Sequence, residues 1–451
     1  MSKSARLEDA VRASTSSLWR DRPFLLFWTG RSISILGSTI SAVVLPILVF
    51  TLTQSPLLTA GLAALEVIPY LLFGLIAGAI ADRGNRRRLM IGCDLLNALL
   101  LASIPLAQLA GILALAQIYI VGFLSATAFV WFDAANFGAL PAIVGKDRLI
   151  AANSAIWSAA TVIGIVGPGV AGALATLYGP AQAVSVDALS YLLSACALAL
   201  IPRAFSTATG SASGAAAGGG SIRDPIIRRT ARDIGAGLRF IWWQPLVRTM
   251  TFLGFGNSLT GGAVVGLLVV YGVQALGVAQ SDLRLGLLFT ASALGSLVAS
   301  LLLPRLIRRF PPGWITLAGL AVSLICLLGL ALAPTYPVGL VFLLLWDGAF
   351  TLTIINGISL RQLVTPDHLQ SRVNASARMI AWGGTPFGAA LGGVLAQAFD
   401  VRIAYLVMAG GAALSLALGL FSPLRQRALA MTPEETSDGG RKDADVVESR
   451  E

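Results

Sequence analysis

Twelve separate stretches of the chain are long and apolar enough to cross a lipid bilayer as α-helices. Such a helix needs roughly 20 apolar residues to span about 30 Å of hydrocarbon. The chain has 451 residues, of which 56% are hydrophobic and only 12% charged, so lipid must serve as its solvent. We therefore predict an all-α membrane protein with twelve transmembrane helices. The predicted spans are 24–50, 57–80, 89–109, 114–139, 156–177, 181–201, 249–271, 285–303, 314–333, 338–360, 380–399 and 403–421.

Basic residues lie almost entirely in the loops on one side of this arrangement. Of the 32 Lys and Arg residues, only Arg284 and Arg402 fall on the other side, and Arg31 lies within a span. Cytoplasmic loops carry such an excess of positive charge. We expect a multi-pass protein of a bacterial-type inner (plasma) membrane, with both termini in the cytoplasm. The net charge of +10 does not indicate nucleic-acid binding, because the charges form short clusters between apolar stretches.

Composition divides the chain into five parts. Residues 206–221 read STATGSASGAAAGGGS, which is typical of a flexible linker. Residues 226–246 mix arginines with large apolar residues and favour an amphipathic helix on the membrane surface, although a plain connector is the alternative. The expected parts are a cytoplasmic N-tail (1–22), a six-helix half (23–203), a cytoplasmic linker with this helix (204–247), a second six-helix half (248–422) and a disordered cytoplasmic C-tail (423–451).

The two predicted halves share a weak internal repeat. Gly37 matches Gly256 and Pro168 matches Pro386, at nearly the same offset along the chain. Transporters built from related halves bind substrate between them, near the middle of the membrane. The repeat therefore predicts two pseudo-symmetric halves around a central site.

The connection between the second and third spans carries a recognisable motif. It reads Gly78-x-x-x-Asp82-Arg83-x-x-Arg86-Arg87. This pattern resembles the signature loop of the major facilitator superfamily of transporters. One departure is Asn85, which stands where the family usually has Gly; Asn also tolerates left-handed backbone.

A second motif, in the fifth span, points to export. Gly167, Pro168 and Gly172 resemble the helix-bending Gly-Pro element of the superfamily's exporters. The segments LPAIV at 140–144 and AANS at 151–154 resemble the branch that exports macrolides and enterobactin. Ser38 stands where this branch often has an acidic residue, and the fourth span lacks the Arg of many proton antiporters. The resemblance implies the major facilitator fold and an exporter.

The depth of the charges along their spans and the same resemblance together indicate a gating and charge-relay group near the cytoplasmic ends of the spans. Asp82 would face the start of the eleventh span, and Arg83 and Arg86 would pair with a carboxylate such as Asp133. We also expect Arg31 to pair with Asp94 or Asp133. Purely structural pairing and direct contact with substrate are both compatible with these positions. The group comprises Gly78, Asp82, Arg83, Arg86, Arg87, Asp133, Arg31 and Asp94.

Three acidic residues fall near the middle of their spans, where a charge is costly and needs a reason. A carboxyl group in a low-dielectric cavity can load and release a proton. Glu66, beside Pro69, is our first candidate for proton coupling and Asp347 our second. The alternative is a carboxyl satisfied by neighbouring helices, which we favour for Asp187 because small residues surround it.

Aromatic residues within the spans are candidates for lining a substrate cavity, although most membrane aromatics pack or lie at interfaces. They are Trp28, Phe129, Trp131, Trp157, Trp346 and Trp382. We expect no cofactor and no metal site, because the only histidine, His368, lies in a polar loop. The sequence shows no nucleophile paired with a base, so we do not expect an enzyme.

These features predict a secondary transporter that exports an amphiphilic small molecule, such as a drug, macrolide or siderophore, by alternating access. Protons are the expected coupling ion and a monomer the expected state. One alternative is an importer or lysolipid transporter of the same fold. An alternative of another class is a membrane scaffold or sensor without transport activity.

Overall fold

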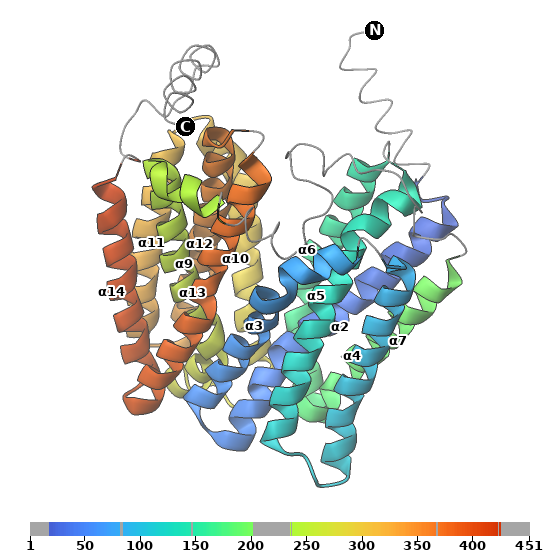
Figure 1. Ribbon diagram of the computed structural model, residues 1–451. Helices are drawn as coiled ribbons and strands as arrows, with labels where there is room; N and C mark the ends of the chain where they lie inside the picture. Colours follow the sequence, from blue (N-terminus) through green and yellow to red (C-terminus); the bar gives the residue numbers. More distant parts are fainter. Residues whose placement is uncertain are drawn as a thin grey trace.

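The structure is a computed structural model that describes residues 18–81, 84–145, 148–201, 235, 237–366, 369–422 and 424. Twelve helices in this part of the chain are long and apolar enough to cross a membrane, which confirms the predicted number. A helix suits this environment because it satisfies its backbone hydrogen bonds internally. The helices, shown in Figure 1, are α2 (Arg22–Thr53), α3 (Pro56–Ala81), α4 (Arg86–Leu109), α5 (Leu115–Val144), α6 (Leu149–Tyr178), α7 (Pro180–Leu200), α9 (Pro245–Val270), which continues into the π-helix η1 (Tyr271–Ala275), α10 (Arg284–Ile307), α11 (Pro312–Leu332), α12 (Tyr336–Val364), α13 (Gln370–Ala398) and α14 (Val401–Leu420).

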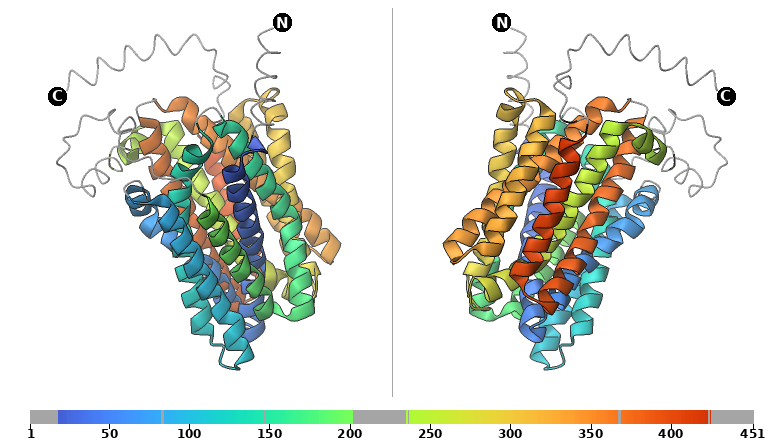
Figure 2. Two further views of the ribbon diagram at one scale, coloured as in Figure 1. Left: turned by 90° about the vertical axis from the view of Figure 1, so that its right-hand side faces the viewer. Right: turned by 90° about the vertical axis from the view of Figure 1, so that its left-hand side faces the viewer.

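The helices run alongside one another, so the bundle has two ends (Figures 1 and 2). We call the end that carries Leu18 and Leu424 the tail end. The other, which carries the short turns such as that at Gly179, is the distal end. Gly179 has a positive φ of 84°, which favours glycine, and this lets α6 reverse directly into α7.

Several helices extend beyond the predicted spans at the tail end. The fourth span was predicted to end at residue 139, and α5 continues to Val144. The eleventh was predicted to begin at residue 380, and α13 begins at Gln370. Apolar patterning marks where the hydrocarbon ends, whereas a helix can continue into the polar surroundings. The tenth span was predicted to end at residue 360, and α12 continues to Val364. Arg361 therefore lies inside α12, where the sequence predicted a loop.

The bundle consists of two six-helix groups. We call α2–α7 the N-half and α9–α14 the C-half. In the N-half, α7 packs against α2 and α4; in the C-half, α13 packs against α9, and α12 against α10. Across the boundary, α3 contacts α13 and α9, and α6 contacts α10 (Figure 2).

The glycines of the internal repeat occupy matching places in the two halves. A Cβ atom on Gly37 of α2 would lie 2.1 Å from Ser190 Oγ of α7. One on Gly256 of α9 would lie 2.4 Å from Ser415 Oγ of α14. Both positions therefore require the absence of a side chain so that two helices approach closely, as small residues do in membranes.

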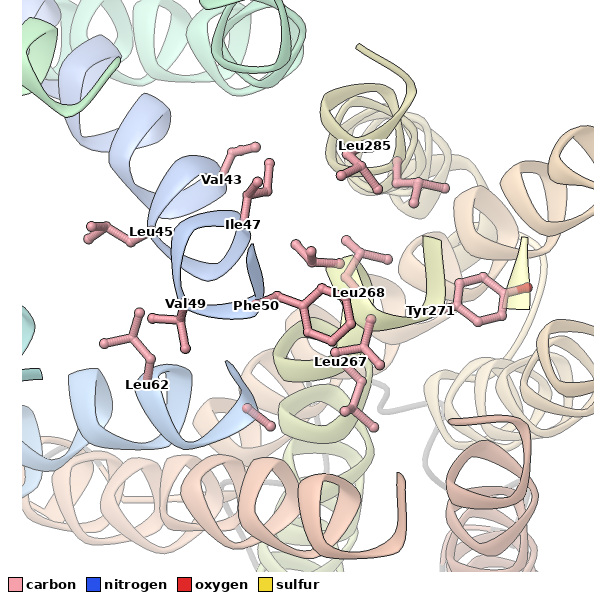
Figure 3. Packing of buried hydrophobic residues seen from close by; sticks show 14 of the residues in the cluster. Val43, Leu45, Ile47, Val49, Phe50, Leu62, Leu267, Leu268, Tyr271 and Leu285 are labelled. Atoms are coloured by element: carbon pink, nitrogen blue, oxygen red, sulfur yellow. The ribbon is translucent and has the colours of Figure 1, made fainter. Parts of the chain in front are cut away.

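Among the described residues, the buried apolar cluster that contains residues of both halves lies at the distal end (Figure 3). Its members include Val43, Ile47, Phe50 and Leu62 of the N-half, and Leu267, Leu268, Tyr271 and Leu285 of the C-half. At the tail end, the clusters around Phe27 and around Leu253 and Val373 each belong to a single half.

The predicted amphipathic helix lies largely outside the described residues. In its described part, residues 237–243 are helical, Ile241 is buried and Trp242 and Trp243 are exposed. Arg248 lies over the Trp242 ring, 5.8 Å from its centre. The predicted disordered C-tail and most of the N-tail also lie outside the described residues.

Candidate functional site

A cavity of about 390 Å³ lies within the N-half and reaches the boundary with the C-half. It has the size of a small-molecule site. Most of its lining comes from α2, α3, α5 and α7, and Trp382 of α13 closes its boundary side. Its polar and aromatic lining residues include Ser38, Glu66, Tyr70, Phe129, Asp187, Tyr191 and Trp382.

Glu66 reaches the surface of this N-half cavity from the middle of α3. Its carboxylate packs against Gly122 of α5, where a Cβ atom would lie 3.7 Å from Glu66 Oε1. Within the described part of the chain, Glu66 makes no hydrogen bond or ion pair. Pro69, one turn later, lacks a backbone N–H and leaves a carbonyl of α3 without its usual donor. The predicted first coupling candidate therefore lies in a cavity, half-buried and free to interact with a ligand or proton.

Asp187 lines the same cavity from α7, although the sequence favoured a close-packing role. Its side chain is 2% exposed, and Asp187 Oδ1 accepts a hydrogen bond of 3.1 Å from Ser190 Oγ. Beside it, the hydroxyls of Ser38 and Tyr191 lie 3.0 Å apart and share a hydrogen bond. The cavity thus carries two carboxylates and a short polar strip on otherwise apolar walls.

A second cavity, of about 300 Å³, lies in the C-half between α9, α11, α12 and α13. Arg361 and Arg378 both line it, with polar side chains that include Asn257 and Asn374. None of its described lining residues is acidic. Trp382 lines this C-half cavity and the N-half cavity alike, so the two meet at its ring.

An aromatic and cationic cluster marks that meeting point. The rings of Tyr70 (α3) and Trp382 (α13) are tilted, with centres 5.1 Å apart. The Arg378 guanidinium lies 4.7 Å from the centre of the Trp382 ring and 5.1 Å from that of Tyr70. Cation–π attraction of this kind stabilises an arginine without engaging all its N–H donors.

Asp347, the second coupling candidate, lines neither cavity. It is half-buried in α12, and Asp347 Oδ1 accepts a hydrogen bond of 3.1 Å from Ser296 Oγ of α10. Ser296 also shares a hydrogen bond of 2.8 Å with Thr351. The carboxylate therefore links α10 to α12.

Of the six predicted cavity aromatics, only Phe129 and Trp382 line the two cavities. Trp346 is 1% exposed and stacks on Phe350 in the core. Trp28 Nε1 donates a hydrogen bond of 3.1 Å to the Ala155 carbonyl, which ties α2 to α6. Trp131 packs against the tail-end cluster of the N-half, and Trp157 is 72% exposed. Apolar periodicity alone does not distinguish these environments.

The charged gating group is only partly described. Asp82 and Arg83 lie outside the described residues, and Gly78 lies in the last turns of α3. Arg86 Nη1 donates a hydrogen bond of 3.1 Å to the Gly138 carbonyl, more than one helical turn beyond Asp133. Asp133 itself is exposed.

Arg87 and Arg31 have contacts that differ from the predicted relay. Arg87 Nε donates a hydrogen bond of 3.0 Å to the Leu198 carbonyl, and its Nη2 donates to that of Ala199, so Arg87 caps the end of α7. Arg31 forms no ion pair with a described residue. Its guanidinium instead lies 4.9 Å from the centre of the Phe132 ring.

Asp94 is the most deeply buried of the group's members whose burial the structure describes. It is 0% exposed, and neither carboxylate oxygen has a hydrogen-bond partner among the described residues. The expected ion pair of Arg31 with Asp94 or Asp133 is therefore replaced by contacts with aromatic rings.

The Gly-Pro element of α6 packs at the boundary between the halves. A Cβ atom on Gly286 of α10 would lie 2.2 Å from the Pro168 carbonyl and 3.0 Å from Gly172. Gly167 lies against Thr39 of α2 in the same way, at 2.8 Å. The motif thus permits close approach of α6 to both halves at the distal end.

The sequence did not assign a cavity role to Tyr70, Asp187, Arg361 or Arg378, which line the two cavities. Only for Asp187 was there a signal, a charge in mid-span. Arg361 directly follows the tenth predicted span and Arg378 lies just before the eleventh, so both resemble the basic residues of a cytoplasmic loop. Among the described residues, no cluster of three or more His, Cys, Asp or Glu side chains that could hold a metal is present.

Comparison with known proteins identifies the family of this chain. The profile of the family described as transmembrane secretion effector matches residues 13–450. The chain is 27% identical to the multidrug efflux pump Tap of Mycolicibacterium fortuitum over 408 residues, which cover 88% of this chain and 95% of Tap. It is 25% identical to the enterobactin exporter EntS of Citrobacter koseri over 429 residues, 91% of this chain and 95% of EntS.

Solved structures support the fold. A bacterial homologue of the human lysosomal transporter Spinster superposes with a TM-score of 0.70 at 15% identity, covering 89% of this chain and 96% of the homologue. At this identity the likeness concerns the fold alone. The predicted fold and the predicted resemblance to the efflux branch are both confirmed.

Proposed function

Because the chain belongs to the transmembrane secretion effector family of major facilitator transporters, we propose that it exports an amphiphilic small molecule in exchange for protons. The observation that carries this proposal is the Glu66 carboxylate, which lies on a cavity wall without a partner among the described residues. Export is favoured as the direction because the relatives include an efflux pump and an exporter.

Proton and substrate compete for the same cavity in this proposal. Glu66 accepts a proton when substrate leaves, and Tyr70, Phe129 and Trp382 supply an apolar and aromatic wall for the substrate. A carboxylate in a water-poor cavity is stabilised by protonation, by a cation or by a hydrogen-bond donor. Asp187, held by Ser190, is the second coupling residue. Asp347 ranks below both because its hydrogen bonds link α10 to α12 outside the cavities.

The division of the apolar core supports alternating access in this proposal. The continuous distal cluster closes one side of the cavities, and the separate tail-end clusters let the halves part on the other. In the proposed orientation the tail end faces the cytoplasm, in agreement with the basic residues there. Transport requires the distal cluster to separate while the tail ends approach, a shift between two populated states.

A proteoliposome assay tests the coupling. Purified protein is reconstituted with an imposed pH gradient, and a panel of dansyl-labelled amphiphiles of negative, zero and positive charge reports movement. We expect Glu66→Gln to abolish gradient-driven movement of the transported probe and Glu66→Asp to retain part of it. Gradient-independent exchange of the probe should survive in Glu66→Gln. Unchanged gradient-driven transport by Glu66→Gln would remove Glu66 from the mechanism.

Asp282→Asn is the matched control. Asp282 lies just before α10, and Arg284 Nε donates a hydrogen bond of 2.8 Å to Asp282 Oδ2. This contact holds the pKa of Asp282 below its ordinary value, so the carboxylate stays ionised at neutral pH. Its neutralisation should leave coupled transport unchanged. Probe movement in the opposite direction would favour the importer. If the wild type moved no probe at all, a scaffold or sensor would be favoured.

A further inference from the structure

Arg361 is a buried cation that lacks an acidic partner among the described residues. Its residue is 7% exposed, and Arg361 Nε has no hydrogen-bond partner there. Burying an unpaired charge costs roughly several kcal/mol unless a counter-ion is present. An anion that enters the cavity would compensate this charge.

The charges around Arg361 do not supply this compensation. The acidic residue of its own helix, Asp347, is about 20 Å away along α12, at a rise of roughly 1.5 Å per residue, and is hydrogen-bonded to Ser296. The described lining of the C-half cavity contains two arginines and no carboxylate. The cavity is therefore positively charged, and its polar neighbours are neutral.

We propose that Arg361 and Arg378 form a binding site for the anionic group of the transported amphiphile: a carboxylate, phosphate or sulfonate. The proposal rests on the transport function above and specifies its substrate class. Arginine suits this task because its planar guanidinium presents a fork of N–H donors to an oxyanion.

Arg378 is oriented for such a ligand. Its guanidinium lies against the faces of Tyr70 and Trp382, so the cation is held in place without an ion pair. Its N–H donors are arranged around the edge of the guanidinium plane. Arg378 therefore stands where the two cavities meet, and Arg361 lies in the C-half cavity.

The charges of the two cavities set the orientation of the substrate. Glu66 and Asp187 repel an anion from the N-half cavity, whereas the arginines attract it to the C-half cavity. The apolar body of the ligand then crosses the Tyr70–Trp382 pair and occupies the wall near Phe129. This arrangement selects molecules with one anionic end and a largely apolar or aromatic body that presents a hydrogen-bond donor to the Glu66 carboxylate.

Binding to three matched probes tests this site. The probes are 11-(dansylamino)undecanoic acid, its neutral methyl ester and the corresponding cationic amine. Energy transfer from tryptophan to the dansyl group reports affinity for the full-length protein in phosphatidylcholine nanodiscs, without any pH gradient. We expect the wild type to bind the acid at least tenfold more tightly than the ester, and the ester more tightly than the amine.

Three variants test which residues cause the preference for the acid over the ester. Arg361→Gln and Arg378→Gln should each reduce the preference for the acid to threefold or less while affinity for the ester changes little. Arg309→Gln, at an exposed position after α10, should keep the full preference. Arg378→Gln keeps the test decisive if Arg361→Gln fails to fold, because Arg378 is exposed to the cavity. Equal binding of acid and ester by the wild type would overturn the proposal, as would an equal loss in Arg309→Gln.

Lipid composition distinguishes the two sources of such a ligand. If phosphatidylglycerol in the nanodisc competes with the acid in the wild type, the site takes a lipid headgroup. If the preference persists, it takes a soluble amphiphile. Either outcome supports the anion site. Failure of the proton-coupling proposal is separable, because Glu66→Gln would then transport normally while the preference for the acid remained.

Discussion

Tyr70 and Trp382 lie on opposite halves of the molecule, and their rings meet with centres 5.1 Å apart. The pair stands where the acidic N-half cavity and the basic C-half cavity meet, and Arg378 contacts both rings. A substrate that touches both cavities must therefore pass this pair. Because its two members belong to different halves, any movement of one half against the other changes the site itself.

Trp382→Ala should weaken binding of all three dansyl probes, in contrast to the arginine variants. The aromatic wall contributes to binding whatever the probe's charge, and such a contact is worth roughly 0.5–1.5 kcal/mol. We expect affinity to fall about three- to tenfold for acid, ester and amine alike, measured by dansyl fluorescence. Trp157→Ala is the control, since Trp157 lines neither cavity; an equal loss there would contradict the assignment.

Gly286→Ala should destabilise distal closure. The added methyl group would meet the Pro168 carbonyl at 2.2 Å, and overpacking of this kind costs about 1–3 kcal/mol. A cysteine introduced at Gln54 in a cysteine-free background should then react faster with a membrane-impermeant maleimide. Gly92→Ala serves as control, because nothing lies within 4 Å of its added methyl group. Equal labelling rates in both variants would show that the α6–α10 contact does not hold the distal end closed.

A crosslink between positions 54 and 280 should arrest transport. Gln280 Nε2 donates a hydrogen bond of 3.0 Å to Gln54 Oε1, so these side chains join the two halves at the distal end. With cysteines at both positions and Cys93, Cys196 and Cys326 replaced, a short methanethiosulfonate crosslinker should stop transport. A reducing agent should restore it. Full transport by the crosslinked protein would mean that the distal ends need not separate.

Arg87→Gln should lower stability more than it lowers transport. The side chain caps α7 through the carbonyls of Leu198 and Ala199, and charge-assisted hydrogen bonds of this kind are worth about 1–3 kcal/mol. We expect a lower Tm in a thiol-reactive dye assay and transport per folded molecule within twofold of wild type. Arg88→Gln is the control, because the Arg88 side chain makes no described contact. Lost transport at unchanged Tm would instead support the predicted gating role of Arg87.

The twelve spans were predictable because lipid imposes a minimum length of apolar sequence on each helix. The equivalence of Gly37 and Gly256 was also visible as a repeat, and each glycine lies at a close contact between two helices of its own half. The tail-end extensions of α5 and α13 were not predictable, since a helix outside the hydrocarbon has no hydropathy signal.

The site was predicted in part. Glu66, Phe129 and Trp382 were found because a charge or an aromatic ring in mid-span is a signal. Trp346 carries the same signal and lies in the core instead, because which helix face points inward depends on the packing of all twelve helices. Arg361 was missed since its burial depends on the end of α12, which continues to Val364.

We propose that the two halves enclose one site and open alternately at either end. Double electron–electron resonance on two spin-label pairs tests it most directly. One pair, at positions 54 and 280, spans the distal end; the other, at 88 and 309, spans the tail end. Adding the transported probe or changing pH should lengthen one distance while the other shortens. Distances that stay fixed, or that lengthen together, in protein that still transports would contradict the account.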